Sequence, residues 1–178
     1  MDSINQNQKE QNHQDLDGKA AVDKLREVVK KAETCFFTTG ETGGATCATR
    51  PMSVRLVDDA GNLWFLSSAD SAKNAAIAAN PNVKLYFQGS PHADLLALEG
   101  VATITREKAR IRQLWSFLLK TWFTDGEDDA RITAIKVAPA RAYYWDNKHG
   151  NAVAGAKILA GAVLGKTMDD SIEGSLTL

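Results

Sequence analysis

Apolar residues change their spacing several times along the chain, and each change predicts a new element. Asp17 is suited to cap a helix, and the apolar residues after it recur at helical spacing: Val22, Leu25, Val28, Val29 and Ala32. The pattern then alternates or becomes continuously apolar, which predicts strands over residues 34–39, 45–57 and 63–67. Glycine and aspartate in the intervening segments predict hairpin turns.

The second half of the chain continues this pattern. Ser71 predicts the cap of a short alanine-rich helix that ends before Pro81, because proline disfavours helix in the residue before it. Strands are predicted over residues 83–88, 95–105, 132–137 and 141–145, the last two joined at Pro139. Two further helices are predicted: one over 107–120, with Leu118 on its apolar face, and one over 156–164, before a polar tail.

These elements amount to about seven strands joined mostly by short turns, with helices at the edges. The pattern predicts a mainly β fold, a β-barrel with peripheral helices, and argues against a doubly wound parallel sheet because helices do not alternate with strands. Residues 95–98 are apolar on both faces, as in a barrel whose outer wall is also covered. We expect a disordered polar arm over residues 1–17, the barrel domain over 18–150, and a C-terminal helix and tail over 151–178.

Composition narrows the class of protein. The 21 basic and 22 acidic residues give a net charge of −1, which argues against a nucleic-acid partner. The first ten residues lack the apolar core of a signal peptide, and the most apolar stretch, residues 152–164, is too short to span a bilayer. Two cysteines are too few for a disulfide scaffold, so we expect a cytoplasmic protein with no membrane partner.

Three motifs resemble reactive sites but lack the context those sites need. Residues 160–167 nearly match the phosphate loop G-x-x-x-x-G-K-T, yet Ala160 replaces the first glycine and a helix precedes the segment, so Gly165 is interpreted as a helix cap. The acidic run over 125–129 lacks the ligand spacing of a calcium loop. The three histidines have no paired spacing, and we therefore expect no metal site.

The segment from Thr49 to Lys73 is the one best suited to bind an anion. Arg50 lies in an otherwise apolar strand, where a guanidinium is costly unless an anion or a carboxylate meets it. After the next hairpin, Ser71 and Lys73 begin a helix, whose N-terminal N–H groups favour phosphate. The residues alone leave open the alternative of an arginine on an edge strand, an ordinary serine cap and a solvated lysine.

Further motifs accompany this segment: Arg50-Pro-Met-Ser-Val54, Leu63-Trp-Phe-Leu-Ser-Ser68, Ser71-Ala-Lys73, Asn80-Pro-Asn-Val83 and Arg141-Ala-Tyr-Tyr-Trp145-Asp146. Their order and spacing over residues 22–146 resemble those of the pyridoxamine-phosphate-oxidase-like FMN-binding split barrels, and within them the general stress protein 26 branch. The resemblance implies an FMN-binding split barrel that forms a homodimer, with FMN at the subunit interface.

The resemblance also implies cofactor-binding residues of three kinds. The FMN phosphate would be held by Arg50, Ser71 and Lys73. The flavin ring would face two strand segments, the first through its backbone: Pro51, Met52 and Ser53, then Phe65 and Leu66. Trp145 of the other subunit would pack near the ring. A flavin requires this combination of an anion clamp and a flat apolar slot.

One departure from the family pattern bears on the substrate. True pyridoxamine-phosphate oxidases carry an Arg-x-His motif and a further arginine shortly after the tryptophan that Trp145 matches, whereas residues 147–152 contain His149 and no arginine. Oxidation of vitamin B6 is therefore disfavoured. Three interpretations stay open: an FMN-dependent oxidoreductase acting on a small molecule, a flavin-binding or flavin-buffering stress protein without turnover, and a relative that uses a deazaflavin or haem. No side chain stands out as a general acid or base, so no catalytic residue is assigned.

Overall fold

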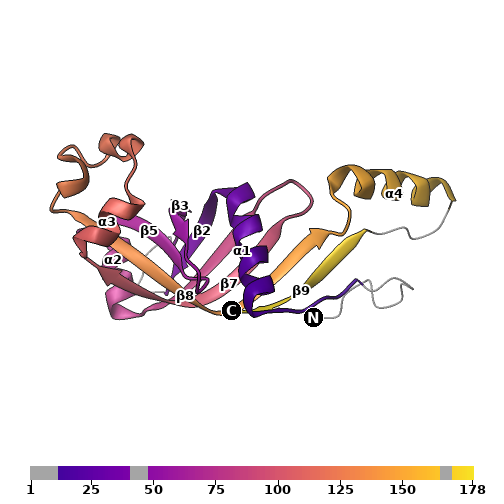
Figure 1. The fold of residues 1–178 in the computed structure, drawn as a ribbon, viewed down its shortest axis with the longest axis horizontal. Coiled ribbons are helices and arrows are strands. Elements are labelled where there is room, and N and C mark those ends of the chain that lie inside the picture. Colours follow the sequence, from indigo (N-terminus) through magenta and orange to yellow (C-terminus); the bar gives the residue numbers. More distant parts are fainter. Residues whose placement is uncertain (1–11, 41–47, 165–169) are drawn as a thin grey trace.

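The computed structural model describes residues 12–40, 48–164 and 170–178, and the strands among them form one nine-stranded sheet (Figure 1). The strands are β1 (Leu16–Asp17), β2 (Thr34–Thr39), β3 (Thr49–Ser53), β4 (Leu56–Val57), β5 (Leu63–Ser68), β6 (Asn82–Gln88), β7 (Leu95–Thr105), β8 (Ile132–Asn147) and β9 (Ser171–Thr177). The helices are α1 (Gly18–Ala32), α2 (Ala72–Ala79), α3 (Lys108–Leu114) and α4 (Asn151–Leu164), with short 3₁₀ helices η2 (Phe117–Thr121) and η3 (Gly126–Asp128).

The strands close into a ring. Antiparallel pairing runs from β3 through β2, β6, β7 and β8 to β5, and β5 pairs with β4, which continues the chain from β3. The chain changes neighbour between β3 and β4: the Val54 N–H donates to the Glu33 carbonyl on the β2 side, 3.0 Å, and the Arg55 N–H donates to the Trp64 carbonyl of β5, 2.8 Å. This closure confirms the predicted mainly β barrel with peripheral helices.

Strand β8 is one continuous strand of 16 residues, where two strands joined at Pro139 are predicted. Pro139 lies opposite Gly100 where the register of β7 and β8 shifts, which is the kind of irregularity at which a residue without an N–H is tolerated. A Cβ at Gly100 would lie 2.5 Å from the Ala138 carbonyl oxygen, so the two strands approach closely there. Residues 132–137 of β8 pair with β5 and residues 142–147 pair with β9, so the strand extends beyond the barrel.

The polar tail predicted after α4 contains strand β9, which pairs antiparallel with β8. Polar residues alternate with Ile172, Gly174 and Leu176 in this segment. Such alternation indicates a strand, but the largely polar composition of the tail obscures it. Part of the expected N-terminal arm is also paired: Gln14 N–H donates to the Glu173 carbonyl, 2.8 Å, and β1 runs parallel to β9. Residues 1–11 lie outside the described part of the chain.

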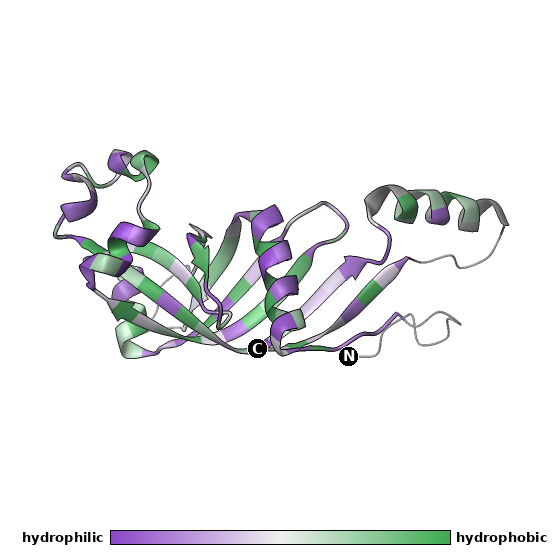
Figure 2. Cartoon of the chain, in the orientation of Figure 1, coloured by the Kyte–Doolittle hydropathy of each residue, from purple (hydrophilic) through white to green (hydrophobic). Residues whose placement is uncertain are grey.

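The main core fills the barrel and the underside of α1. Figure 2 shows apolar residues along the barrel strands and on α1. Fully buried side chains from α1 and from the strands meet there, among them Leu25, Phe37, Phe65, Leu85 and Ile135. The helical spacing predicted from Val22 to Ala32 is confirmed, because Val22, Leu25, Val28 and Val29 are buried on α1 and Ala32 packs half-buried against the same core. A second, smaller cluster lies on the outer face of β5 and β8 under α3, with Trp64 and Ile111 among its members.

The helix predicted over residues 107–120 is wrong in its second half. Helix α3 ends at Leu114, and Trp115 is extended, with φ −67° and ψ 145°. The Arg55 Nε donates to the Leu114 carbonyl, 3.0 Å, so a side chain satisfies the end of the helix in place of a further turn. Leu118, expected on the apolar face, is 76% exposed. Tertiary packing of Trp115 on the second cluster overrides the helical spacing here.

Within the described residues, no helix is long and apolar enough to cross a membrane. The predicted turn over residues 40–44, the first residues of the strand expected over 45–57, and the expected cap at Gly165 lie wholly or largely outside the described residues.

Candidate anion site at the barrel seam

The barrel wall has an unpaired stretch. Strand β3 pairs with β2 and with no other described strand, and from Phe65 to Ser68 strand β5 pairs with β8 alone. We call these two stretches, Thr49–Ser53 and residues 65–68, the seam. Arg50 on β3 and Lys73 on α2 lie near enough to interact electrostatically, so α2 begins beside the seam.

Helix α2 begins at the seam with the predicted cap. The Ser71 hydroxyl accepts a hydrogen bond from the Asn74 N–H, 3.2 Å, which confirms Ser71 as the N-cap, and the helix ends at Ala79 before Asn80-Pro81. The Ser71 hydroxyl also lies 3.1 Å from the Ser67 hydroxyl at the end of β5. Two hydroxyls and the first N–H groups of α2 therefore gather at one point.

Lys73 is buried, with 8% of its surface exposed, and its ammonium group donates to the Ser67 hydroxyl. Burial, and then the nearby positive charge of Arg50, lower the pKa of Lys73 to about 8. Among the described residues, no carboxylate pairs with Lys73. An ammonium held out of water beside a second cation is costly unless an anion joins them.

Arg50 is positioned from the other side of the seam. Its Nη2 donates to the Ala48 carbonyl, 2.9 Å, and to the hydroxyl of Thr39, 3.3 Å. Both acceptors are neutral, and no ion pair of Arg50 occurs among the described residues. The structure therefore brings together Arg50, Ser71 and Lys73, as the sequence predicts, and adds Ser67 and Thr39, which the sequence analysis did not single out. The signal for Ser67 is its place two residues after Phe65, on the inner face of β5.

A second layer of hydrogen bonds holds α2 against the strands. The Asn74 Nδ2 donates to the Thr133 hydroxyl, 2.9 Å, and that hydroxyl donates to the Ser67 carbonyl, 3.0 Å. Asn74 and Thr133 are both buried, so this chain of bonds fixes the start of α2 relative to β5 and β8. The anion site is thus rigidly attached to the barrel.

The predicted ring-binding residues differ in what they offer. Pro51 and Ser53 are exposed and Met52 is half-buried on β3, whose outer edge has no described partner strand, so their backbone is available to a ligand. The Phe65 side chain is fully buried and packs edge-to-face on Phe37, with ring centroids 5.3 Å apart. Leu66 is the second predicted ring-binding residue on β5, and its side chain packs in the second cluster. At the seam, β5 therefore presents mainly its backbone.

Trp145 does not join this site within one chain. It lies near the far end of β8, pairs with Leu95 and Glu173, and stacks on Tyr143 with ring centroids 4.8 Å apart. Thr133, which contacts the base of α2, is separated from Trp145 by about 40 Å of strand at ~3.3 Å per residue. Trp145 therefore lies away from the seam of its own chain.

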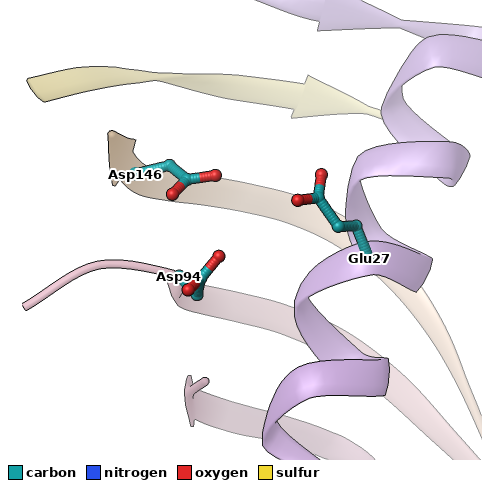
Figure 3. A group of neighbouring side chains, drawn as sticks. All are labelled: Glu27, Asp94 and Asp146. Carbon is teal, nitrogen blue, oxygen red and sulfur yellow. The ribbon is translucent and has the colours of Figure 1, made fainter. Parts of the chain in front are cut away.

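Three carboxylates form a separate cluster beside α1, from Glu27, Asp94 and Asp146 (Figure 3). Two ammonium groups already occupy them: Lys24 pairs with Asp146 and with Glu27, and Lys31 pairs with Glu27, 2.8 Å, and Asp94, 2.5 Å. Hydrogen bonds to Asp94 and Glu27 raise the pKa of Lys31 well above its usual range. The cluster is an ion-pair network that ties α1 to the ends of β7 and β8.

A third polar group follows Trp145. The Asp170 carboxylate, whose side chain is fully buried, accepts from the His149 Nδ1, 2.7 Å, from the His149 backbone N–H, 2.9 Å, and from the Lys157 ammonium, 2.7 Å. Burial raises the pKa of Asp170, but the hydrogen bonds from Lys157 and His149 outweigh it and lower the pKa to about 2. This group fixes the base of α4 to the end of β8.

A model of the family described as pyridoxamine 5′-phosphate oxidase like matches residues 20–169. The chain belongs to this family. The resemblance inferred from the sequence motifs is thereby confirmed. "Protein bli-3" of Neurospora crassa is 23% identical over 140 residues, which are 74% of this chain and 67% of that protein.

Solved structures share the fold. A general stress protein 26 from Jannaschia sp. CCS1 matches with a TM-score of 0.74 and 19% identity, over 88% of this chain and 97% of its own. The general stress FMN/FAD binding protein of Xanthomonas citri matches with a TM-score of 0.59 and 22% identity, over 68% of this chain and 85% of its own. The family member described here therefore has the split-barrel fold of general stress proteins.

Proposed function

We propose that this chain is an FMN-binding flavoprotein of the general stress type, in which two copies share each FMN and the flavin exchanges hydride or electrons with a small molecule. The observation that carries the proposal is the buried Lys73 ammonium beside Arg50, with no carboxylate partner among the described residues. Two converging cations at the start of α2 fit a phosphate dianion.

The surroundings of the cations favour a flavin nucleotide over a simple anion. The seam continues from Arg50 along β3, where half-buried Met52 and an open backbone edge can meet a flat ring that carries hydrogen-bonding groups. A neighbour with the same fold, from Xanthomonas citri, is named an FMN/FAD binding protein. We therefore favour FMN over a deazaflavin or haem.

Each residue has a binding role in this proposal. Arg50 and Lys73 neutralise the phosphate, and the hydroxyls of Ser67 and Ser71 orient its oxygens. The backbone of residues 51–53 and 65–66 faces the flavin ring. When bound, FMN supplies the hydride or electron transfer, and the protein binds and orients it.

The second copy completes the site. Because Trp145 lies far along β8 from Thr133, its proposed place near the flavin ring requires the partner's Trp145. A two-fold dimer then has two equivalent shared sites, each with a clamp from one chain and a tryptophan from the other.

A second candidate function is flavin storage without turnover. It is favoured by the described residues around the seam: Arg50 and Lys73 donate to neutral oxygens and are assigned to the phosphate, and the Asp70 carboxylate accepts from the Ser68 hydroxyl. Incubation of the FMN-loaded protein with NADH or NADPH separates the two candidates. Bleaching of the flavin absorbance supports an oxidoreductase, and an unchanged spectrum supports storage.

The proposal itself is tested by binding. The purified protein should be yellow, or should take up FMN with micromolar or tighter affinity, and should bind riboflavin much more weakly because riboflavin lacks the phosphate. Equal affinity for FMN and riboflavin would contradict the assignment of the clamp.

A further inference from the structure

The anion site contains a lysine and two serines whose side chains follow one another. The Lys73 ammonium donates to the Ser67 hydroxyl, and the Ser67 hydroxyl lies 3.1 Å from the Ser71 hydroxyl. Lys73 and Ser67 are buried, with 8% and 4% of their surfaces exposed, whereas Ser71 is half-buried. We call these three residues the relay. Groups connected in this way can pass a proton from the outermost hydroxyl to the amine.

Neighbouring hydrogen bonds give the relay a direction. The Asn74 N–H donates to the Ser71 oxygen, 3.2 Å, so the Ser71 proton is available to the Ser67 oxygen. While Lys73 is charged, the Ser67 hydroxyl can donate to the Ser68 carbonyl, 3.3 Å. When Lys73 is neutral, its lone pair can accept the Ser67 proton, and Ser67 can accept the proton of Ser71. The relay therefore moves a proton inward only when the lysine is neutral.

Lys73 can be neutral at moderate pH. Burial, and then the positive charge of Arg50, lower its pKa to about 8. Among the described residues no carboxylate pairs with Lys73. Asp70, the acidic residue beside the relay in sequence, accepts from the Ser68 hydroxyl and interacts with Arg131. About half of the chains thus hold a neutral amine at pH 8, and a neutral amine is what a lysine needs to act as a base.

The start of α2 supplies a further requirement of acyl transfer. The first N–H groups of a helix have no partner within the helix, and in α2 they belong to Ala72 and Lys73, next to Ser71 in the chain. Ala72 is exposed, so a ligand can approach this end of the helix. Such N–H groups stabilise the negative oxygen that forms when a hydroxyl attacks a carbonyl. A hydroxyl, a proton relay and N–H donors therefore lie together.

We propose that Ser71 is a nucleophile, and that the flavin-free protein transfers acyl groups from uncharged carboxylic esters through Ser71 to water. The Ser71 oxygen bonds to the ester carbonyl carbon while its proton passes to Ser67 and the Ser67 proton passes to Lys73. The bond to the ester's alkoxide breaks, and the alkoxide takes the proton back from Lys73. Water then attacks the acyl group on Ser71 by the same path, which releases the carboxylic acid and restores the Ser71 hydroxyl.

The charges at the site favour an uncharged ester over an anionic one. An anion beside Lys73 and Arg50 holds the lysine in its charged form, and an ammonium group cannot accept a proton. Phosphate, and FMN in the proposed function, should therefore inhibit acyl transfer both by occupying the site and by keeping Lys73 charged. Flavin binding and acyl transfer are thus alternative uses of one site.

Acetylation by p-nitrophenyl acetate tests the inference. The full-length chain, from which any bound flavin has been removed by dialysis, should release nitrophenolate faster than buffer does and should carry an acetyl group on Ser71. Peptide mass spectrometry locates this group, and hydroxylamine should remove it, because hydroxylamine cleaves esters and leaves the amides of acetylated lysines intact. The rate should rise about tenfold per pH unit below pH 8 and level off above, as expected for a base with a pKa of about 8.

Three variants separate the relay from an effect on folding, which circular dichroism monitors. Ser71→Asn keeps a helix cap but removes the nucleophile, and should lower the acetylation rate at least about 100-fold. Ser67→Ala and Lys73→Arg should each lower it at least about tenfold, and Lys73→Arg should lose the rise toward pH 8 because arginine stays charged. The matched control is Ser116→Ala, a half-buried serine at the start of η2 whose side chain makes no cap hydrogen bond, and it should react like the native chain.

The outcomes separate this inference from the proposed function. If no hydroxylamine-sensitive acetyl group forms on Ser71, or if Ser71→Asn and Ser116→Ala react equally fast, the acyl-transfer role is wrong, whatever FMN titration gives. If the group forms but the native protein does not bind FMN, the role stands and the proposed function fails. Both stand if FMN binds and prevents acetylation, whereas undiminished acetylation with FMN bound would overturn the role.

Discussion

Burial, and then the nearby Arg50 guanidinium, lower the pKa of the Lys73 ammonium to about 8, although a protein usually keeps like charges apart. Neither cation has a carboxylate partner among the described residues, and α2 adds its N-terminal N–H groups to the same point. The free protein therefore holds two positive charges that repel each other at the seam, and a bound anion would reduce this repulsion.

The first prediction concerns this clamp. Arg50→Ala with Lys73→Ala should weaken FMN binding by at least about 100-fold, because hydrogen bonds to charged groups contribute about 1.5–3 kcal/mol each. Riboflavin affinity should hardly change. Calorimetric titration gives both values. The matched control is Lys84→Ala with Arg141→Ala, which removes two exposed cations that pair with Glu99 and should leave FMN affinity unaltered.

The second prediction concerns pH. Because the pKa of Lys73 is about 8, the free protein loses this charge as the pH rises above 8, and FMN affinity should fall by up to about tenfold per pH unit there. The phosphate is already a dianion at that pH, so it does not contribute to the change. Lys73→Arg should flatten the profile, since arginine stays charged. A native affinity that is constant from pH 7.5 to 9.5 would be evidence against a phosphate on Lys73.

The same shift predicts how stability depends on pH without ligand. The folded pKa of Lys73 lies below its ordinary value of 10.5, so the unfolded chain binds more protons between about pH 8 and 10.5. The contribution of Lys73 to the free energy of unfolding should therefore rise with pH across this window. Urea denaturation of the native protein and of Lys73→Met gives the difference, and saturating phosphate should reduce it.

The third prediction uses mixed dimers. Trp145→Ala should lose much of the quenching of flavin fluorescence, and Arg50→Ala with Lys73→Ala should lose FMN. A mixture of the two variants should regain one native site per heterodimer, with the clamp from one chain and Trp145 from the other. Quenched, bound FMN in the mixture supports a shared site. Quenching in Trp145→Ala alone equal to that of the native protein would contradict it.

The fourth prediction concerns Asp170. Its folded pKa of about 2 lies below the ordinary value of 3.8, so its contribution to stability is complete above about pH 4 and is lost as the pH falls through 2. Asp170→Asn should be less stable than the native protein at pH 6, and the gap should narrow toward pH 2. Asp125→Asn, which changes an exposed aspartate, is the control and should show no such gap.

The fifth prediction concerns the substrate. The FMN-loaded protein should produce no pyridoxal phosphate from pyridoxamine phosphate and oxygen, because residues 147–152 offer no arginine to hold the substrate phosphate and the His149 Nδ1 is bound to Asp170. The arginines of α3 are also engaged: Arg110 lies over the Trp64 ring at 4.2 Å, and Arg112 pairs with Asp128. Rapid turnover measured by product absorbance would overturn this.

The strands of the barrel can be predicted from the local hydrophobic pattern, whereas the continuity of β8 and the existence of β9 cannot. Alternation and apolar runs predict β2, β5, β6 and β7 almost to the residue, because each fills the barrel with its own side chains. The continuity of β8 across Pro139 depends on a register shift opposite Gly100, which no local window contains. Strand β9 is hidden by its polar composition, since only one face of it is covered.

The residues of the anion site also fall into two groups: those that local sequence signals predict and those that only the fold brings to the site. Arg50, Ser71 and Lys73 stand out because a cation in an apolar strand and a capped helix start are local signals. Ser67 joins them through hydrogen bonds with Lys73 and Ser71, and Thr39 through one from Arg50. These bonds depend on how the strands and α2 pack, so sequence reasoning missed both residues. The burial of Lys73 is likewise a tertiary property.

The pairing of β1 with β9 has a consequence for the order of folding. Asp15 accepts a hydrogen bond from Ser175, 160 residues away in sequence, and the parallel β1–β9 pair closes the same long loop. Closing a loop of this length costs more entropy than any hairpin of the barrel, so contacts of this kind form slowly. During synthesis, residues 12–17 are made before residues 171–177, so β1 cannot pair with β9 until the end. The hairpins between them can form earlier. The barrel can thus form before β1 and β9 pair at the edge of the sheet. Strand β9, which pairs with the part of β8 that carries Trp145, is then added after the strands of the seam have formed.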